Sequence, residues 1–77
     1  MLLKDVAAGQ SCIVEHIDLP FQMERRLEAL GMTRQTRISV VNRKGKGILI
    51  IKLRGTRFAL GRQITERITV RQEGDAA

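Results

Sequence analysis

Hydrophobic and polar residues alternate along several short segments of the chain, and turns rich in glycine separate these segments. A period of two residues is typical of strands that bury one face. The pattern predicts five short strands, over residues 10–17, 36–43, 48–54, 58–60 and 67–72.

Between the first two strands the hydrophobic spacing changes to that of a helix. Met23, Leu27 and Leu30 stand at i, i+4 and i+7 and predict one short helix over residues 21–30, with this stripe packed onto the sheet. Pro20 suits the first turn of such a helix, and Gly31 is the usual residue just past a helix end. We expect Asp18 or a neighbour to cap the helix, and a further single helical turn over residues 61–66.

Two glycine-containing turns connect the later strands. The run Lys44-Gly45-Lys46-Gly47 lacks the spacing of a phosphate-binding P-loop and precedes a strand rather than a helix, so it is interpreted as a hairpin turn. Gly55-Thr56 is interpreted as a two-residue hairpin of type II′, because glycine comes first.

Five short strands are too few for a sandwich, and free sheet edges invite aggregation, which closure into a small barrel avoids. The prediction is therefore a mainly β fold, a small β-barrel of about five strands with one short α-helix between strands 1 and 2. The 77 residues suffice for a single domain, 1–77, with a frayed tail over 73–77. With two Phe and no Trp or Tyr, the core must consist mainly of Ile, Leu, Val and Met, and it leaves no room for a deep pocket.

Cysteine usage and hydropathy indicate a reducing compartment. Cys12 is the single cysteine, so no internal disulfide forms. The start of the chain does not resemble a signal peptide, and no apolar run approaches the ~20 residues needed to span a bilayer. We expect a cytoplasmic protein.

Residues for catalysis or metal binding do not cluster. Cys12 and His16 would share one face of the first strand but lie roughly 13 Å apart, too far to hold one metal or to form a nucleophile–base pair without a bulge between them. Cys12 is better interpreted as a core residue and His16 as a surface residue. We expect no enzymatic activity, no catalytic residue, no metal ligand and no cofactor.

Charge is distributed unevenly along the chain. The formal net charge is +6, and residues 34–77 carry eleven basic residues against three acidic ones. A basic barrel can bind nucleic acid through backbone phosphates, and this is the alternative function. It is disfavoured because single-strand binders stack bases on exposed aromatics, whereas Phe21 and Phe58 both suit the core. The basic residues that would track phosphates are Arg34, Arg37, Arg43, Lys44, Lys46, Lys52, Arg54 and Arg57.

The segment Arg26-Leu27-Glu28-Ala29-Leu30-Gly31-Met32 resembles the R-L-x-x-L-G-L/M signature of FeoA-like proteins, the small component of bacterial ferrous iron transport. The similarity extends from Leu3-x-x-Val6-x-x-Gly9 through Phe58-Ala59-Leu60-Gly61-Arg62 to Ile68-Thr69-Val70. The resemblance implies an SH3-like barrel, a cytoplasmic location and regulation of a FeoB-type membrane GTPase and iron transporter. It does not imply enzymatic activity or a small-molecule substrate. Related SH3-like domains also occur in metal-dependent repressors, and transition-metal binding is often ascribed to the family.

Two turns depart from the family pattern. The family usually has Pro-Gly where this chain has Arg34-Gln35, which predicts a different or strained backbone there. The next hairpin has Lys44-Gly45-Lys46-Gly47 where the family tends towards Gly-Asp-Pro.

The resulting hypothesis is a protein-binding adaptor without chemistry of its own. Arg25, Arg26, Met32 and Arg34 are predicted to form a mixed basic and apolar patch beside the helix end, because Arg and Met are enriched at protein interfaces.

Overall fold

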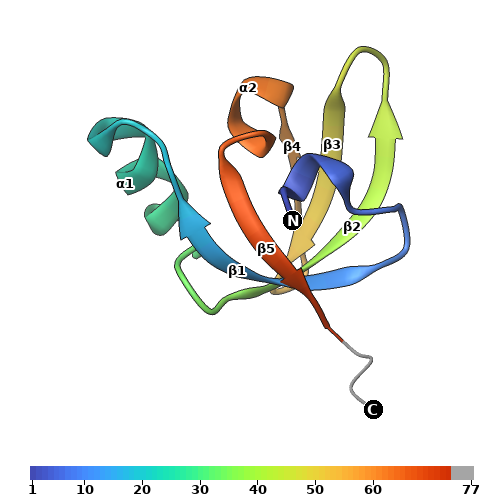
Figure 1. Ribbon diagram of the computed structural model, residues 1–77, viewed down its shortest axis with the longest axis horizontal. Helices are drawn as coiled ribbons and strands as arrows, with labels where there is room; N and C mark the ends of the chain where they lie inside the picture. Colours follow the sequence, from blue (N-terminus) through green and yellow to red (C-terminus); the bar gives the residue numbers. More distant parts are fainter. Residues whose placement is uncertain (74–77) are drawn as a thin grey trace.

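The computed structural model describes residues 1–73, which form one five-stranded antiparallel sheet with strand order β4-β3-β2-β1-β5. The sheet curls around the core as an open barrel (Figure 1). The strands run as β1 Ser11–Ile17, β2 Arg37–Lys44, β3 Ile48–Leu53, β4 Thr56–Leu60 and β5 Ile68–Gln72. The helical elements are η1 Leu3–Asp5, α1 Phe21–Ala29 and α2 Arg62–Thr65. The predicted mainly β fold and the helix between strands 1 and 2 are confirmed, and η1 is an element that the sequence pattern did not predict.

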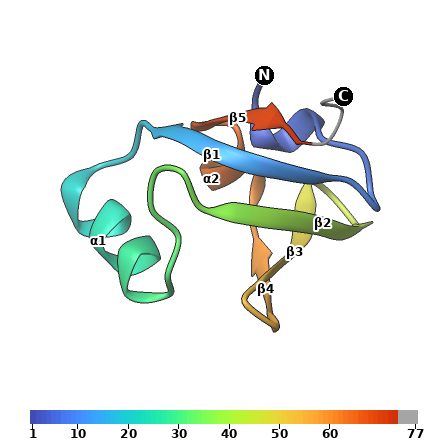
Figure 2. The same ribbon diagram turned by 90° about the horizontal axis from the view of Figure 1, so that it is seen from below.

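Two bulges allow the sheet to bend. The pairing of β1 with β5 shifts between Val14 and His16, and that of β2 with β3 shifts between Val40 and Asn42. A bulge adds one residue to a strand and increases its local twist. The curled sheet leaves η1 and α2 in contact with each other, with η1 also against β5 and α2 against β3 (Figures 1 and 2).

The core consists of aliphatic and sulfur-containing side chains, as the composition predicts. They come from every strand and also from η1 and α1; the buried set is Leu3, Val6, Cys12, Val14, Ile17, Leu27, Met32, Ile38, Val40, Leu49, Ile51, Leu53, Leu60, Ile68 and Val70. Phe58 is half-buried against this cluster. Phe21, in contrast, is 69% exposed, so its predicted place in the core is wrong.

The hairpin between β3 and β4 differs from the predicted one by one residue. Leu53 pairs with Thr56, so Arg54 and Gly55 are the two loop residues rather than Gly55 and Thr56. Both have positive φ, 52° and 83°, which is the geometry of a type I′ turn rather than type II′. The predicted turn type is wrong because Arg54 accepts a left-handed backbone that its side chain does not favour.

The ends of α1 are formed by backbone hydrogen bonds. The carbonyl of Pro20 accepts from the N–H groups of Met23 and Glu24, and no side chain caps the helix, so the expected cap by Asp18 is wrong. Asp18 lies 3.7 Å from Arg67 instead.

Glu73, the first residue of the predicted frayed tail, is paired with two other parts of the chain. Glu73 donates its backbone N–H to Ser11 and lies 2.6 Å from the Arg37 side chain. Residues 74–77 of the predicted tail lie outside the described residues.

Candidate protein-binding surface

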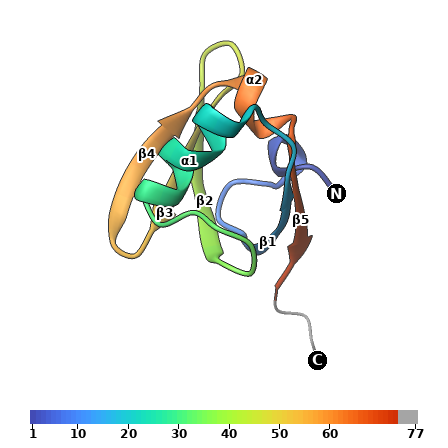
Figure 3. The same ribbon diagram turned by 90° about the vertical axis from the view of Figure 1, so that its left-hand side faces the viewer.

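Helix α1 projects from one end of the barrel, beyond the ends of the strands (Figures 2 and 3). Of the predicted hydrophobic stripe, Leu27 is buried and Met23 is half-buried, but Leu30 is 46% exposed. The assignment of Leu30 to the packed stripe is therefore wrong. The reason is positional, since a nine-residue helix at the rim of the sheet buries only the middle of its apolar stripe.

The outward face of α1 carries an exposed aromatic side chain and two cations. Phe21 is 69% exposed, and the guanidinium carbon of Arg25 lies 5.5 Å from the centre of its ring, a cation–π contact across one helical turn. Arg26 is exposed on the same helix. At 3.6 residues per turn, Arg25 and Arg26 lie between Phe21 and Leu30 around the helix. We refer to Phe21, Arg25, Arg26 and Leu30 as the α1 surface.

The predicted patch is only partly present. Arg25, Arg26 and Arg34 are exposed, whereas Met32 is 1% exposed and belongs to the core. Met32 cannot contact a partner, so its place in the predicted patch is wrong. Gly31, with φ 101°, turns the chain at the helix end and directs Met32 inward.

Phe21 and Leu30 replace Met32 as the apolar part of this surface. The sequence contains a signal for Phe21, because the helical period places it about 160° around the helix from Met23. No comparable signal in the sequence marks Leu30 as exposed, because its spacing from Met23 and Leu27 is the spacing expected of a buried helix residue.

The turn that follows α1 positions Arg34. Thr36 donates its N–H to the carbonyl of Thr33 at 3.2 Å, which makes Arg34 and Gln35 the central residues of a β-turn. The hydroxyl of Thr36 also lies 3.0 Å from that of Thr33. Gln35 has φ 71°, as a type II turn requires at its third position, and so the strain expected where the family has glycine is confirmed.

Cys12 and His16, the single cysteine and the single histidine of the chain, lie on different faces of β1. The bulge in β1 puts Cys12 inside and His16 outside, so the expectation that they share a face is wrong. Burial raises the pKa of the Cys12 thiol to about 11, and the charge of Glu73 adds to the effect, so the residue is a thiol and not a thiolate near neutral pH. Within residues 1–73 no three His, Cys, Asp or Glu side chains gather closely enough to hold a metal ion.

Comparison with known proteins identifies the family. A family model described as the FeoA domain matches residues 1–72. The chain belongs to the FeoA family. No curated protein sequence matched it, and no helix among residues 1–73 is long and apolar enough to cross a membrane.

Solved structures of FeoA proteins share this fold. An iron uptake regulatory protein (FeoA) is 29% identical, with a TM-score of 0.85 over 95% of this chain and 97% of that one. FeoA of Stenotrophomonas maltophilia, complexed with zinc and described as a procaryotic SH3 domain protein, is 30% identical, with a TM-score of 0.79 over 95% of both chains. The SH3-like fold is thereby confirmed. A manganese-dependent transcriptional repressor, 23% identical with a TM-score of 0.84 over 95% of this chain and 41% of that one, shares the fold alone.

Membership of the FeoA family assigns the chain to ferrous iron transport. The family is a small accessory domain without catalytic activity of its own.

Proposed function

We propose that this protein is a non-enzymatic adaptor that regulates ferrous iron uptake by docking its α1 surface on the cytoplasmic GTPase part of a FeoB-type membrane transporter. The observation that carries the proposal is the projecting helix of a FeoA-family chain, which leaves Phe21 and Leu30 exposed beside two arginines. This adaptor would act in the cytoplasm, where that GTPase domain is expected.

The composition of the α1 surface supports protein recognition. Aromatic residues and arginine are enriched at protein interfaces and among the residues that dominate binding energy. Phe21 is also held by Arg25, so less side-chain freedom is lost when a partner covers the pair. A partner face that is apolar with acidic residues around it would complement this surface.

Docking would regulate the transporter only if the adaptor binds its states with different affinity. A ligand with equal affinity for two conformations shifts neither population. We therefore expect the affinity for the GTPase domain to depend on whether it holds GDP, a GTP analogue or no nucleotide.

The test is calorimetry of the 77-residue protein with the GTPase domain of the cognate transporter in those three states. Arg25→Glu with Arg26→Glu should weaken binding by about tenfold or more, which corresponds to about 1.4 kcal/mol. Lys44→Glu with Arg57→Glu is the matched control, because it makes the same change in charge at exposed positions on β2 and β4 instead of α1. An equal loss of affinity in both variants would show that the GTPase domain is attracted by the overall charge of the protein and does not dock on α1.

Nucleic-acid binding through backbone phosphates is the second candidate. The exposure of Phe21 removes part of the argument against it, since one aromatic side chain is available for stacking. A nucleic acid ligand would lose affinity steeply and linearly in log salt concentration. Saturable nucleic acid binding with that salt dependence, and no binding of the GTPase domain in any state, would favour this candidate.

The expectation that no metal cofactor is needed stays a prediction. The zinc of the Stenotrophomonas maltophilia structure belongs to that protein. In this chain the buried thiol of Cys12 and the outward His16 point to an adaptor that binds its partner without a resident metal.

A further inference from the structure

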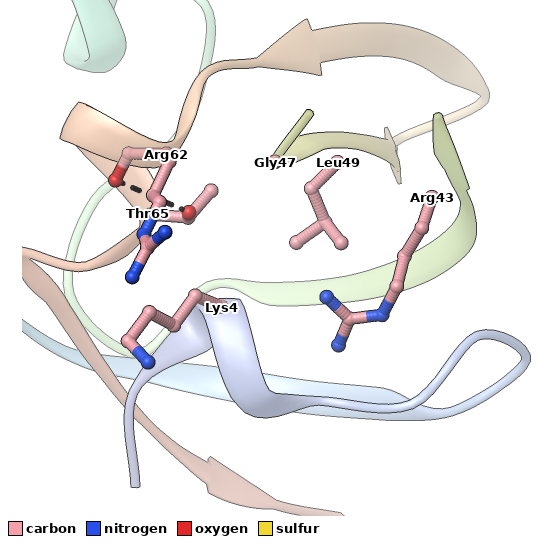
Figure 4. Close-up of a pocket in the computed structure, with 6 residues that line it drawn as sticks. All are labelled: Lys4, Arg43, Gly47, Leu49, Arg62 and Thr65. Carbon is pink, nitrogen blue, oxygen red and sulfur yellow. Dashed lines mark hydrogen bonds between the residues drawn. The ribbon is translucent and has the colours of Figure 1, made fainter. Parts of the chain in front are cut away.

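A small pocket lined by three basic side chains lies at the end of the barrel that η1 and α2 occupy (Figure 4). Its volume is about 190 Å³. The lining residues are Lys4, Arg43, Gly47, Leu49, Arg62 and Thr65, of which three are cationic and none is acidic. None of them belongs to α1, so the pocket is separate from the α1 surface.

The three cationic side chains that line the pocket come from different parts of the chain. Lys4 comes from η1, Arg43 from β2 and Arg62 from α2. Lys4 and Arg62 lie on one side of the pocket and Arg43 on the other (Figure 4). Bringing like charges together is unfavourable, and the fold retains this arrangement without a carboxylate among the lining residues.

Existing partners leave much of this charge uncompensated. Arg43 donates one guanidinium N–H to the carbonyl of Val6, which holds the group in place, and it makes no ion pair within residues 1–73. Lys4 pairs with Asp5 at 3.3 Å and Arg62 with Glu66 at 3.9 Å. The Arg62–Glu66 pair is exposed and the Lys4–Asp5 pair is partly exposed, and ion pairs open to solvent neutralise charge weakly.

The walls of the pocket are fixed by packing. Leu49 and Thr65 are 2% and 1% exposed, so these two lining residues are anchored in the buried interior. Gly47, with φ 84°, lets the β2–β3 turn approach α2, because an added Cβ would lie 3.0 Å from the Cβ of Arg62. Clefts lined by one sign of charge over low-dielectric walls concentrate the electrostatic field.

We propose that this pocket binds the terminal phosphate group of a small soluble anion, either free phosphate or a nucleoside polyphosphate. A phosphate offers several oxygens and more than one negative charge, so it can accept from Lys4, Arg43 and Arg62 together. Arginine forks and lysine ammonium groups are the side chains that recognise phosphate in this way. Since a water occupies about 30 Å³ of liquid, the pocket has room for a phosphate but leaves a nucleoside outside.

The binding mode differs from that of a phosphate-binding loop. Gly45-Lys46-Gly47 has no long helix behind it, and the proposed contacts come from side chains instead of backbone N–H groups. The inference goes beyond the proposed adaptor function and does not depend on the α1 surface.

The proposal is tested by NMR titration of the ¹⁵N-labelled 77-residue protein with phosphate, pyrophosphate and ATP at constant ionic strength, with acetate as the control anion. Saturable shifts are expected at the amides of Gly47, Leu49 and Thr65 for at least one phosphate compound. Saturation by phosphate or pyrophosphate alone identifies a free anion as sufficient, whereas saturation by ATP alone identifies a nucleoside polyphosphate.

Matched variants locate the site. Lys4→Gln with Arg62→Gln should reduce the affinity by about tenfold or more, since charge-assisted hydrogen bonds are lost. Lys52→Gln with Arg57→Gln removes the same charge from exposed positions outside the pocket and should change the affinity by no more than about twofold. If the Lys4→Gln with Arg62→Gln variant does not give the NMR spectrum of a folded protein, Arg43→Gln replaces it, and the same loss of affinity is expected from this residue on the opposite wall of the pocket. No saturable binding, equal shifts with acetate, or equal losses in both double variants would overturn the proposal.

Discussion

The backbone N–H of Met32 donates to the carbonyl of Leu27 at 2.9 Å, and both side chains are buried in the same core. Gly31 donates to Glu28 at 2.9 Å in the same turn. These two hydrogen bonds and the positive φ of Gly31 form a Schellman motif. In this motif a hydrophobic contact commonly joins the two side chains at the positions that Leu27 and Met32 occupy here. The motif ties the projecting helix to the barrel.

Met32 should therefore matter for stability and not for direct partner contact. Met32→Ala is expected to lower the free energy of unfolding by about 2–5 kcal/mol, because it leaves a cavity in the core. Leu30→Ala, at an exposed position two residues away, should change it by no more than about 0.5 kcal/mol. Urea unfolding measures both. Similar losses for the two variants would contradict this division of roles.

Gln35 occupies a backbone conformation that glycine would adopt with less strain. A left-handed conformation costs a non-glycine residue about 1–2 kcal/mol, and the greater freedom of glycine in the unfolded chain offsets part of the gain. Gln35→Gly should raise the free energy of unfolding by about 0.5–1 kcal/mol. The substitution also removes the hydrogen bond that Arg71 donates to the Gln35 side chain at 3.3 Å, but this bond is exposed and its loss costs little stability.

Gln35→Ala is the control for this substitution, because it removes the same side-chain bond and keeps the strained backbone. It should be no more stable than the parent protein in thermal unfolding. A destabilised Gln35→Gly variant would show that the side-chain contact outweighs the backbone strain.

Two glycines allow backbone conformation to be tested without steric clashes. An added Cβ would meet nothing within 4 Å at either Gly55 or Gly61, but Gly55 has φ 83° and Gly61 has φ −74°. Gly55→Ala should cost about 1 kcal/mol or more, since the type I′ turn requires a left-handed residue. Gly61→Ala should be neutral or stabilising by about 0.4–1 kcal/mol. Thermal unfolding of the pair provides the measurement, and equal effects would argue against the type I′ assignment.

The order of the strands along the chain and the position of α1 were predictable because both depend on local periodicity. The alternation in β5 distinguishes inward from outward residues directly. The positive φ of Gly31 was equally predictable, because a glycine just past a helix end commonly adopts a left-handed backbone conformation.

The wrong predictions concern places where a shift of one residue in strand pairing changes which residues face the core or form the turn. The bulge at Glu15 separates Cys12 and His16 onto different faces, and nothing in the local sequence marks it. The hairpin after Leu53 begins at Arg54, a residue that rarely has positive φ. At the bulge the pairing of β1 with β5 overrides local preference, and at the hairpin the pairing of Leu53 with Thr56 does so.

The candidate surfaces were less predictable than the fold. Helical periodicity explains the outward direction of Arg25 and Phe21, but the exposure of Leu30 depends on how far α1 extends beyond the sheet. The phosphate pocket combines Lys4, Arg43 and Arg62 from three elements, so its composition appears only in the folded chain.

The buried thiol of Cys12 predicts a loss of stability at high pH. Its side chain is fully buried, and burial, with a smaller effect of Glu73, raises its pKa from 9.0 to about 11. A group whose pKa is higher in the folded state contributes stability below its unfolded pKa and loses that contribution as the pH rises to the folded value. Since each pKa unit corresponds to about 1.4 kcal/mol, the loss between pH 9 and pH 11 is at most about 3 kcal/mol.

Cys12→Ala isolates this effect, because every other side chain is the same in both proteins and its contribution cancels in the difference. Urea unfolding should show a constant offset between the two proteins below pH 9 and a decline of the parent relative to the variant from pH 9 to pH 11. Ellman's reagent should leave the native thiol unmodified at pH 7.4 and react with it in denaturant. A difference between the two proteins that stays constant across this range, or rapid native labelling, would mean that solvent reaches Cys12 and that the core around β1 opens.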